Sequence, residues 1–211
     1  MNPIVLLLSL FFLATPVQDS KYDQGMQKAF ELWGAGKNKE AINLFERIEA
    51  AEPEKWQPAF YVAQITVLDA FSIKDETELA GELAKAQDYI NRVKSLSKDN
   101  PDVLVLEAQY YTAWVAFDGQ KYGMMYAAKV DELYKKALQL DPDRPTVVLA
   151  KAQWDMGSAA FFGKSTDPYC AAIERAIALS DTYQPAEKYA PRVSKEYAQQ
   201  VLAQSCRKSE D

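Results

Sequence analysis

An internal repeat of about 45 residues constrains the fold of this chain more than any other feature. The dipeptide Ala-Gln starts at residues 63, 108, 152 and 198, in steps of 45, 44 and 46 residues, although two further copies at 86 and 203 do not follow this spacing. A second dipeptide, Ala-Phe, starts at 70, 116 and 160, at a nearly fixed offset from the first three copies. Two markers that keep one offset indicate a repeat unit whose length is in the range of helical-hairpin arrays.

The second half of each unit carries apolar residues at helical spacing. Offsets of 0, 3, 4, 7 and 8 place side chains on one face of an α-helix. In the third unit these positions are Val130, Leu133, Tyr134, Ala137 and Leu138. The same offsets recur from Tyr169 to Ile177, and similar stripes run through 79–96 and 41–48. Each unit is therefore expected to end in an amphipathic helix.

Prolines mark the ends of the units. Pro53, Pro101 and Pro142 each follow an acidic or amide residue, and Pro185 does so less regularly. Proline cannot continue a helix and biases the preceding residue away from helical geometry, so these positions predict hairpin boundaries. The expected helices are four pairs and a last helix: 22–35 with 38–51, 55–71 with 75–97, 102–117 with 121–140, 144–162 with 167–180, and 188–206.

The first unit resembles the tetratricopeptide repeat (TPR). In GKNKEAINLFERIEAAEP, a turn at Gly36 leads to Ala41, Phe45, Ile48 and Pro53, which is the family's order of turn, small residue, aromatic, aliphatic residue and closing proline. The segment VDELYKKALQLDPDRP has the same ending. The chain departs from the family in its period, about 45 instead of 34 residues, and in lacking the usual tryptophan and glycine of the first helix.

This resemblance implies an all-α fold. The expected architecture is a TPR-like right-handed superhelix of about four helix pairs plus a C-terminal capping helix, with the first helices of the pairs on the concave side. A small residue is expected wherever two helices approach closely, at Ala29, Ala63, Ala108, Ala152 and Ala198. The chain is most similar to exported bacterial members of the family with expanded, divergent repeats.

The N-terminus has the pattern of an export signal. An apolar run from Ile4 to Ala14 is followed by polar residues. A membrane-spanning helix needs about 20 apolar residues, and this run is about half as long. We therefore expect residues 1–18 to be a cleaved signal peptide and 19–211 to form the repeat domain. The mature form would have no membrane span and would be periplasmic or secreted.

Two cysteines leave two alternatives open. Cys170 and Cys206 are the only cysteines of the chain. In an oxidising compartment they can form a single disulfide. Two free thiols are the other alternative that the sequence leaves open.

Composition argues against several functional classes. The net charge is −6 and the basic residues are scattered, so a nucleic-acid partner is not expected. The chain has no histidine, which removes the commonest general base and the commonest transition-metal ligand. No phosphate-binding loop, nucleophile elbow, metal-ligand spacing or cofactor motif is recognisable. We expect a protein that is not an enzyme and that uses no cofactor or metal.

The candidate partner-binding residues lie on the first helices. Gln64, Gln109 and Gln153 each follow a close-packing alanine, so they should project in similar directions and offer amide groups to a partner. Tyr110 and Trp154 are the adjoining aromatic candidates. Two alternatives remain: the glutamines could form hydrogen bonds between helices, and the aromatic residues could fill gaps in the array.

Two functions follow from this surface. The first is a non-catalytic interaction or scaffold module that binds a peptide or protein in the concave groove. The alternative is a carrier of a small apolar ligand, or a transport-associated TPR component. A peptide groove should be open and lined by polar groups, whereas a carrier should enclose an apolar cavity of roughly 300–1,000 Å³.

Overall fold

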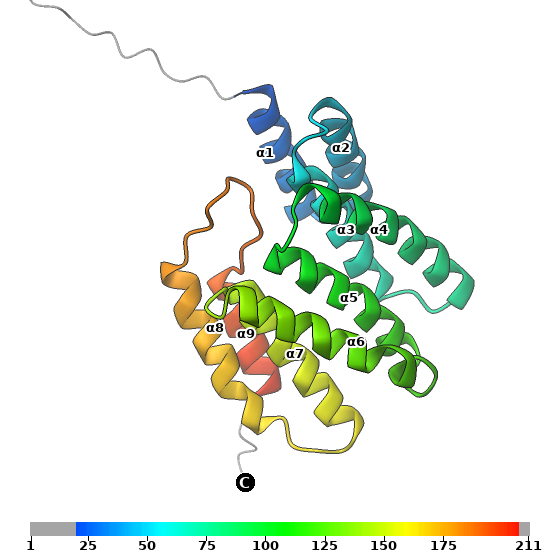
Figure 1. Ribbon diagram of the computed structural model, residues 1–211, viewed down its shortest axis with the longest axis vertical. Coiled ribbons are helices and arrows are strands. Elements are labelled where there is room, and N and C mark those ends of the chain that lie inside the picture. The colour runs from blue at the N-terminus through cyan, green and yellow to red at the C-terminus, as the bar shows by residue number, and fades with distance from the viewer. Residues whose placement is uncertain (1–19, 207–211) are drawn as a thin grey trace, which may run out of the picture.

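The computed structural model describes residues 20–206, and this part of the chain is all helical. Figure 1 shows the helices packed in adjacent pairs, which confirms the predicted TPR-like helical-repeat class. The described residues form nine α-helices and one short 3-10 helix. Their bounds are α1 Lys21–Gly34, α2 Asn38–Ala51, α3 Trp56–Ala70, α4 Glu76–Leu96, α5 Pro101–Phe117, α6 Gly119–Leu140, α7 Pro145–Phe161, η1 Asp167–Tyr169, α8 Cys170–Thr182 and α9 Lys195–Ser205.

Local sequence fixes the helix ends. Helices α5 and α7 begin at Pro101 and Pro145, where the missing N–H of proline costs no helical hydrogen bond. The Asp118 carboxylate accepts hydrogen bonds from two backbone N–H groups at the start of α6. Between α1 and α2, Gly36 has φ +73°, a left-handed conformation that glycine adopts without steric cost.

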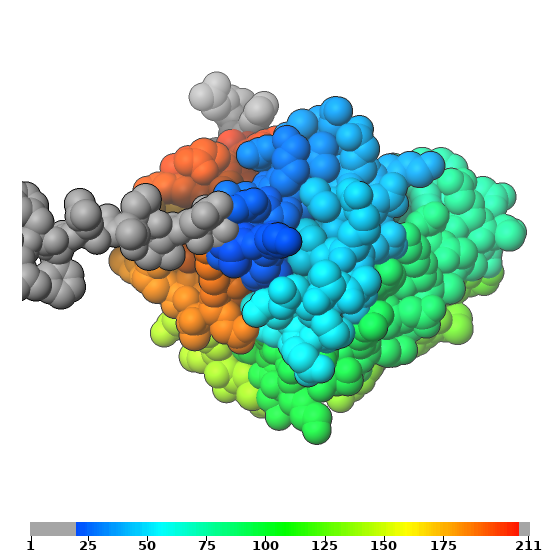
Figure 2. Space-filling model, turned by 90° about the horizontal axis from the view of Figure 1, so that it is seen from above, coloured from blue at the N-terminus to red at the C-terminus, as the bar shows by residue number. Residues whose placement is uncertain are grey.

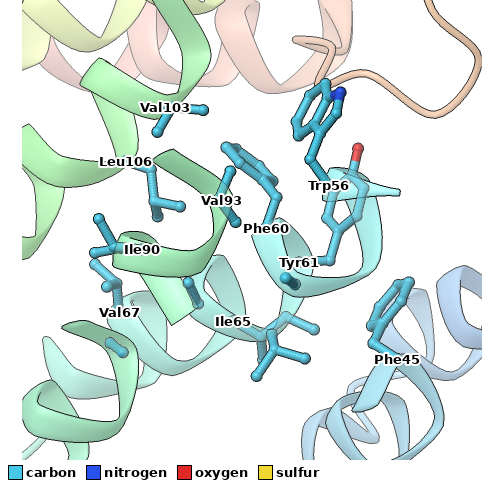
Figure 3. Packing of buried hydrophobic residues seen from close by; sticks show 14 of the residues in the cluster. Phe45, Trp56, Phe60, Tyr61, Ile65, Val67, Ile90, Val93, Val103 and Leu106 are labelled. Atoms are coloured by element: carbon cyan, nitrogen blue, oxygen red, sulfur yellow. The ribbon is translucent and has the colours of Figure 1, made fainter. Parts of the chain in front are cut away.

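The helices differ in how much of their surface is buried. In α3 nearly every residue from Trp56 to Val67 is buried, whereas α2, α4, α6 and α8 bury a single apolar face. Figure 3 shows Val67 of α3 beside Ile90 of α4 and Leu106 of α5, and these residues belong to one core cluster. The first helices α3, α5 and α7 thus form the inner layer of the array, and the second helices cover it.

Alanines lie where the helices approach closely. The five positions predicted from the resemblance are at most 2% exposed: Ala29, Ala63, Ala108, Ala152 and Ala198. Ala108 of α5 packs in a core cluster with Val130, Leu133 and Ala137 of α6. A side chain with a single methyl group lets two helix backbones come close together.

Replacing Ala108 with leucine is expected to lower the free energy of unfolding by about 1–3 kcal/mol, because three extra carbons must enter a filled core. Urea denaturation measures the change. Ala84→Leu is the matched control, since Ala84 is exposed on α4 and a surface substitution usually changes stability by less than about 0.5 kcal/mol. Equal midpoints for wild type and Ala108→Leu would contradict the close approach at this position.

Three features relate to the cellular compartment of the protein: the predicted signal peptide, the cysteines and the absence of a membrane-spanning helix in residues 20–206. The predicted signal peptide, residues 1–18, lies outside the described residues. Cys170, at the start of α8, forms a disulfide with Cys206, which follows α9, with the two Cα atoms 5.9 Å apart. None of the helices in residues 20–206 is long and apolar enough to cross a membrane.

The start of the last helix was predicted wrongly. A helix was expected at 188–206, but α9 begins at Lys195. Pro191 lies inside the predicted range, Tyr189 has φ +62°, and the Ser194 hydroxyl caps α9 by accepting from the Tyr197 backbone N–H. Residues 183–194 instead form a non-helical connection between α8 and α9, which we name the crossing segment.

Candidate ligand-binding pocket

The crossing segment reaches from the last repeat to the first two pairs of helices. The Glu187 carboxylate accepts hydrogen bonds from the Trp56 indole N–H, at 2.8 Å, and from the Gln57 amide, at 2.9 Å. The Tyr61 hydroxyl donates to the backbone oxygen of Tyr189, at 2.9 Å. In Figure 1 this orange segment rises beside α1, and in Figure 2 the orange atoms lie against the blue atoms of the N-terminal helices. The last repeat is therefore connected to the second pair of helices.

Asp23 of α1 holds the middle of the crossing segment. Its carboxylate accepts from the Lys188 ammonium, at 2.5 Å, and from the Tyr189 hydroxyl, at 2.9 Å. The hydrogen bond from Lys188, with others from Ser20 and Tyr189, holds the pKa of Asp23 well below its ordinary value of 3.8. The same bond raises the pKa of Lys188. Each charge stabilises the charged form of the other.

The Asp23 contact predicts a specific pH dependence. A carboxyl group whose pKa is lower in the folded state stabilises the fold above its unfolded pKa, and this contribution is lost as the pH falls through the folded pKa. Wild type should therefore melt at a higher temperature than Asp23→Asn at neutral pH, and the difference should shrink as the pH falls below about 4. Thermal melts of both proteins from neutral to acid pH measure this. A difference that stays constant over the whole range would contradict the contact.

A cavity of about 710 Å³ lies between the first helices and the crossing segment. Each of α1, α3, α5 and α7 contributes lining residues, for example Phe30, Gln64, Gln109 and Gln153. Residues 188–194 and Tyr197 of α9 complete the wall. The volume is that of pockets for cofactor-sized or drug-sized molecules.

One wall of this pocket is aromatic. The ring of Phe30 lies 4.6 Å from that of Tyr61 in an edge-on arrangement, and 5.9 Å from Tyr189 in a stacked one. Trp33 and Phe60 also contact Tyr61, with ring centres 5.9 and 5.4 Å away. In Figure 3 the Tyr61 hydroxyl and the Trp56 indole point the same way, away from Ile65. Ring faces and edges of this kind suit a flat conjugated molecule.

The three predicted glutamines all line the pocket, one repeat apart. The Gln153 amide donates to the Tyr197 hydroxyl, at 3.2 Å. Within residues 20–206 the structure gives the side chains of Gln64 and Gln109 no hydrogen-bond partner. Their amide groups are therefore available to a molecule in the pocket, and their part in binding stays a prediction.

The two predicted aromatic residues do not line the pocket. Tyr110 packs against the first core cluster and contacts Tyr111, with ring centres 5.0 Å apart. Trp154 is buried against α6, and its indole N–H donates to the Asp131 carboxylate, at 2.8 Å. Each follows a pocket glutamine by one position, which turns its side chain about 100° around the helix, into the contacts between helices.

The charged residues of the pocket wall are Asp102, Lys188 and Arg192. Asp102 is only 1% exposed and forms an ion pair with Arg144, and its other oxygen accepts from the Thr146 hydroxyl, at 2.5 Å. Burial raises the pKa of the Asp102 carboxyl, and Arg144 opposes this effect. No cluster of three or more His, Cys, Asp or Glu side chains suited to a metal ion exists between residues 20 and 206.

Two parts of the pocket were not predicted from the sequence. Phe30 and Trp33 of α1 were not singled out, because the repeat markers begin only at residue 63. The crossing segment was missed because residues 188–194 were assigned to a helix. Pro191, inside the predicted range, was a readable signal against that helix.

Comparisons with known proteins identify solved structures with a similar fold. No family model matches the chain, and no curated protein matches it in sequence. Among solved structures it is similar to the HusA haemophore from Porphyromonas gingivalis, with TM-score 0.76 and 21% identity over 88% of this chain and 93% of that one. It is also similar to a thermophilic TPR protein from Thermus thermophilus, with TM-score 0.59 and 17% identity over 76% and 75% of the two chains. At these identities the likeness concerns the fold.

Proposed function

We propose that this protein is an exported, non-catalytic carrier that holds a flat, largely apolar molecule of the porphyrin class in its concave pocket. The observation that carries the proposal is the pocket itself, a cavity of about 710 Å³ with an aromatic wall, bounded on one side by the crossing segment. The similarity to a haemophore over nearly all of both chains supports the choice of ligand class.

A peptide-binding scaffold is the second candidate. Gln64 and Gln109 favour it, because amide groups one repeat apart match the N–H and C=O groups of an extended peptide. The crossing segment argues against it, since residues 188–194 form part of the pocket wall and narrow the space open to an extended chain. The carrier is therefore the better supported of the two.

The composition of the chain suggests how a porphyrin would be held. Haem iron is usually bound by histidine, cysteine, methionine or tyrosine. This chain has no histidine, and Cys170 and Cys206 are joined to each other. Tyr189 and Tyr197 line the pocket, so tyrosine is the remaining type of iron ligand on its wall. Equal affinities for haem and metal-free porphyrin would mean that ring contacts with residues such as Phe30 supply most of the binding, and tighter binding of haem would indicate a tyrosine ligand.

We also propose export for the carrier. A disulfide persists in oxidising compartments, so the Cys170–Cys206 bond supports a periplasmic or secreted location. The apolar run from Ile4 to Ala14 would be the signal that directs it there.

Titration of the purified protein with haem and with metal-free protoporphyrin IX tests the proposal, followed by the Soret absorbance and by porphyrin fluorescence. We expect one molecule to bind per chain with a dissociation constant of about 1 µM or less, which corresponds to about 8 kcal/mol. Gln109→Trp should weaken binding of both ligands at least tenfold, because the larger side chain fills part of the cavity.

The matched control is Gln120→Trp, which places the same new side chain on an exposed position of α6 outside the pocket. It should bind like wild type. Absence of saturable binding by wild type, or equal affinities of Gln109→Trp and Gln120→Trp, would overturn the carrier. A protein partner recovered by crosslinking from the native envelope, and lost on replacing Gln109 and Gln153, would then favour the scaffold.

A further inference from the structure

We infer that the ligand of this pocket carries a carboxylate and that Arg192 of the crossing segment binds it. The inference rests on the proposed carrier function and specifies the chemistry of the molecule carried. It depends on the charge balance of the pocket wall, on the place of Arg192 in it, and on the amide groups beside it.

The charge balance of the pocket wall leaves one cation uncompensated. Lys188 is neutralised by Asp23, and Asp102 is neutralised by Arg144, which lies outside the lining. Arg192 is the remaining charged residue of the wall, and among residues 20–206 no acidic side chain forms an ion pair with it. An acidic group of a ligand would therefore meet one unpaired positive charge in this pocket.

Arg192 is exposed, and its buried neighbours anchor the backbone at this point of the crossing segment. Pro191 and Ala190 are buried, and Ala190 belongs to the same core cluster as Tyr61 and Phe60. The Arg192 side chain lines the same cavity as Tyr61 and Tyr189 of the aromatic wall. The guanidinium thus belongs to the part of the pocket where a flat ligand would contact the rings.

The guanidinium group of arginine is well suited to bind a carboxylate of a porphyrin. A guanidinium offers N–H donors in a planar fork that matches two carboxylate oxygens. The amide N–H groups of Gln64 and Gln109 line the same cavity and add neutral donors. A ligand with an apolar ring system and one or more carboxylates would use both the aromatic wall and this cation.

The test compares protoporphyrin IX, which has two free carboxylates, with its dimethyl ester, in which both are neutral. Each is titrated into wild type and Arg192→Gln, which removes the charge and keeps an amide donor. We expect Arg192→Gln to weaken binding of the diacid about tenfold, in line with a partly exposed charged hydrogen bond, and to leave binding of the ester within about twofold. Raising the salt concentration should weaken only the diacid, and only in wild type.

Lys164→Gln is the matched control, because Lys164 is an exposed cation in the connection after α7 and does not line the pocket. It should bind both ligands like wild type. If Arg192→Gln binds the diacid like wild type, or loses the diacid and the ester equally, the carboxylate contact is wrong while the carrier stands. If wild type binds neither porphyrin, the carrier function is wrong and the inference is overturned with it.

Discussion

Replacing Asp102 with alanine is expected to lower the free energy of unfolding by about 3 kcal/mol. The Asp102 carboxylate is 1% exposed and joins α5 to α7 through Arg144 and Thr146. Removing one partner of a buried ion pair costs about 3–5 kcal/mol, because the other charge stays out of water. We expect the lower end of this range, since Arg144 keeps its second partner, Asp141, at 3.1 Å.

Urea denaturation of Asp102→Ala and Asp143→Ala measures the effect against a matched control. Asp143 forms an ion pair with Arg175, but both side chains are about half exposed or more, and exposed pairs contribute about 0–1 kcal/mol. Asp143→Ala should therefore be close to wild type. Similar losses in the two variants would mean that the Asp102 pair does not connect the third and fourth repeats as described.

The helices were predictable because their signals are local. The apolar spacing from Val130 to Leu138 and the prolines at 101 and 142 depend only on neighbouring residues. The structure places helices over all nine predicted ranges, with boundary differences of three residues or fewer except at α9. There Pro191 was read as part of a helix, although its ring excludes it from a helix interior.

The candidate site was predictable only where it follows the repeat. Gln64, Gln109 and Gln153 share one repeat position, and the structure places all three at one pocket. Tyr110 and Trp154 are one position further on, and a single residue is enough to turn a helical side chain from the concave face into the core.

The part of the pocket wall that the crossing segment supplies could not be predicted from local patterns. It depends on contacts such as Trp56 with Glu187 and Tyr61 with Tyr189, which are 131 and 128 residues apart in sequence. No periodicity connects these positions. These residues come into contact only in the folded array, where the crossing segment lies against α3.

Removing the disulfide, by Cys170→Ala with Cys206→Ala, is expected to lower the free energy of unfolding by about 2–4 kcal/mol. The bond closes a segment with a sequence separation of 36 residues, and restricting the unfolded chain over that length stabilises the fold by about this amount. Thermal or urea denaturation measures the loss. Wild type in a strong reductant should behave like the double variant, and the double variant itself should not respond to the reductant.

Removing the disulfide should also weaken ligand binding, because the segment that the disulfide closes contains α8, the crossing segment and α9. Ala198 and Val201 of α9 still pack in one core cluster with Val148 of α7 and Ile173 of α8 in the variant, so the fold should persist while its last helix opens more often. Each opening frees Arg192 and Tyr189 from the pocket wall. We therefore expect the double variant to bind protoporphyrin IX several-fold more weakly at a temperature where it is fully folded. Unchanged affinity in a clearly less stable variant would mean that the crossing segment is held by Asp23 and Trp56 alone.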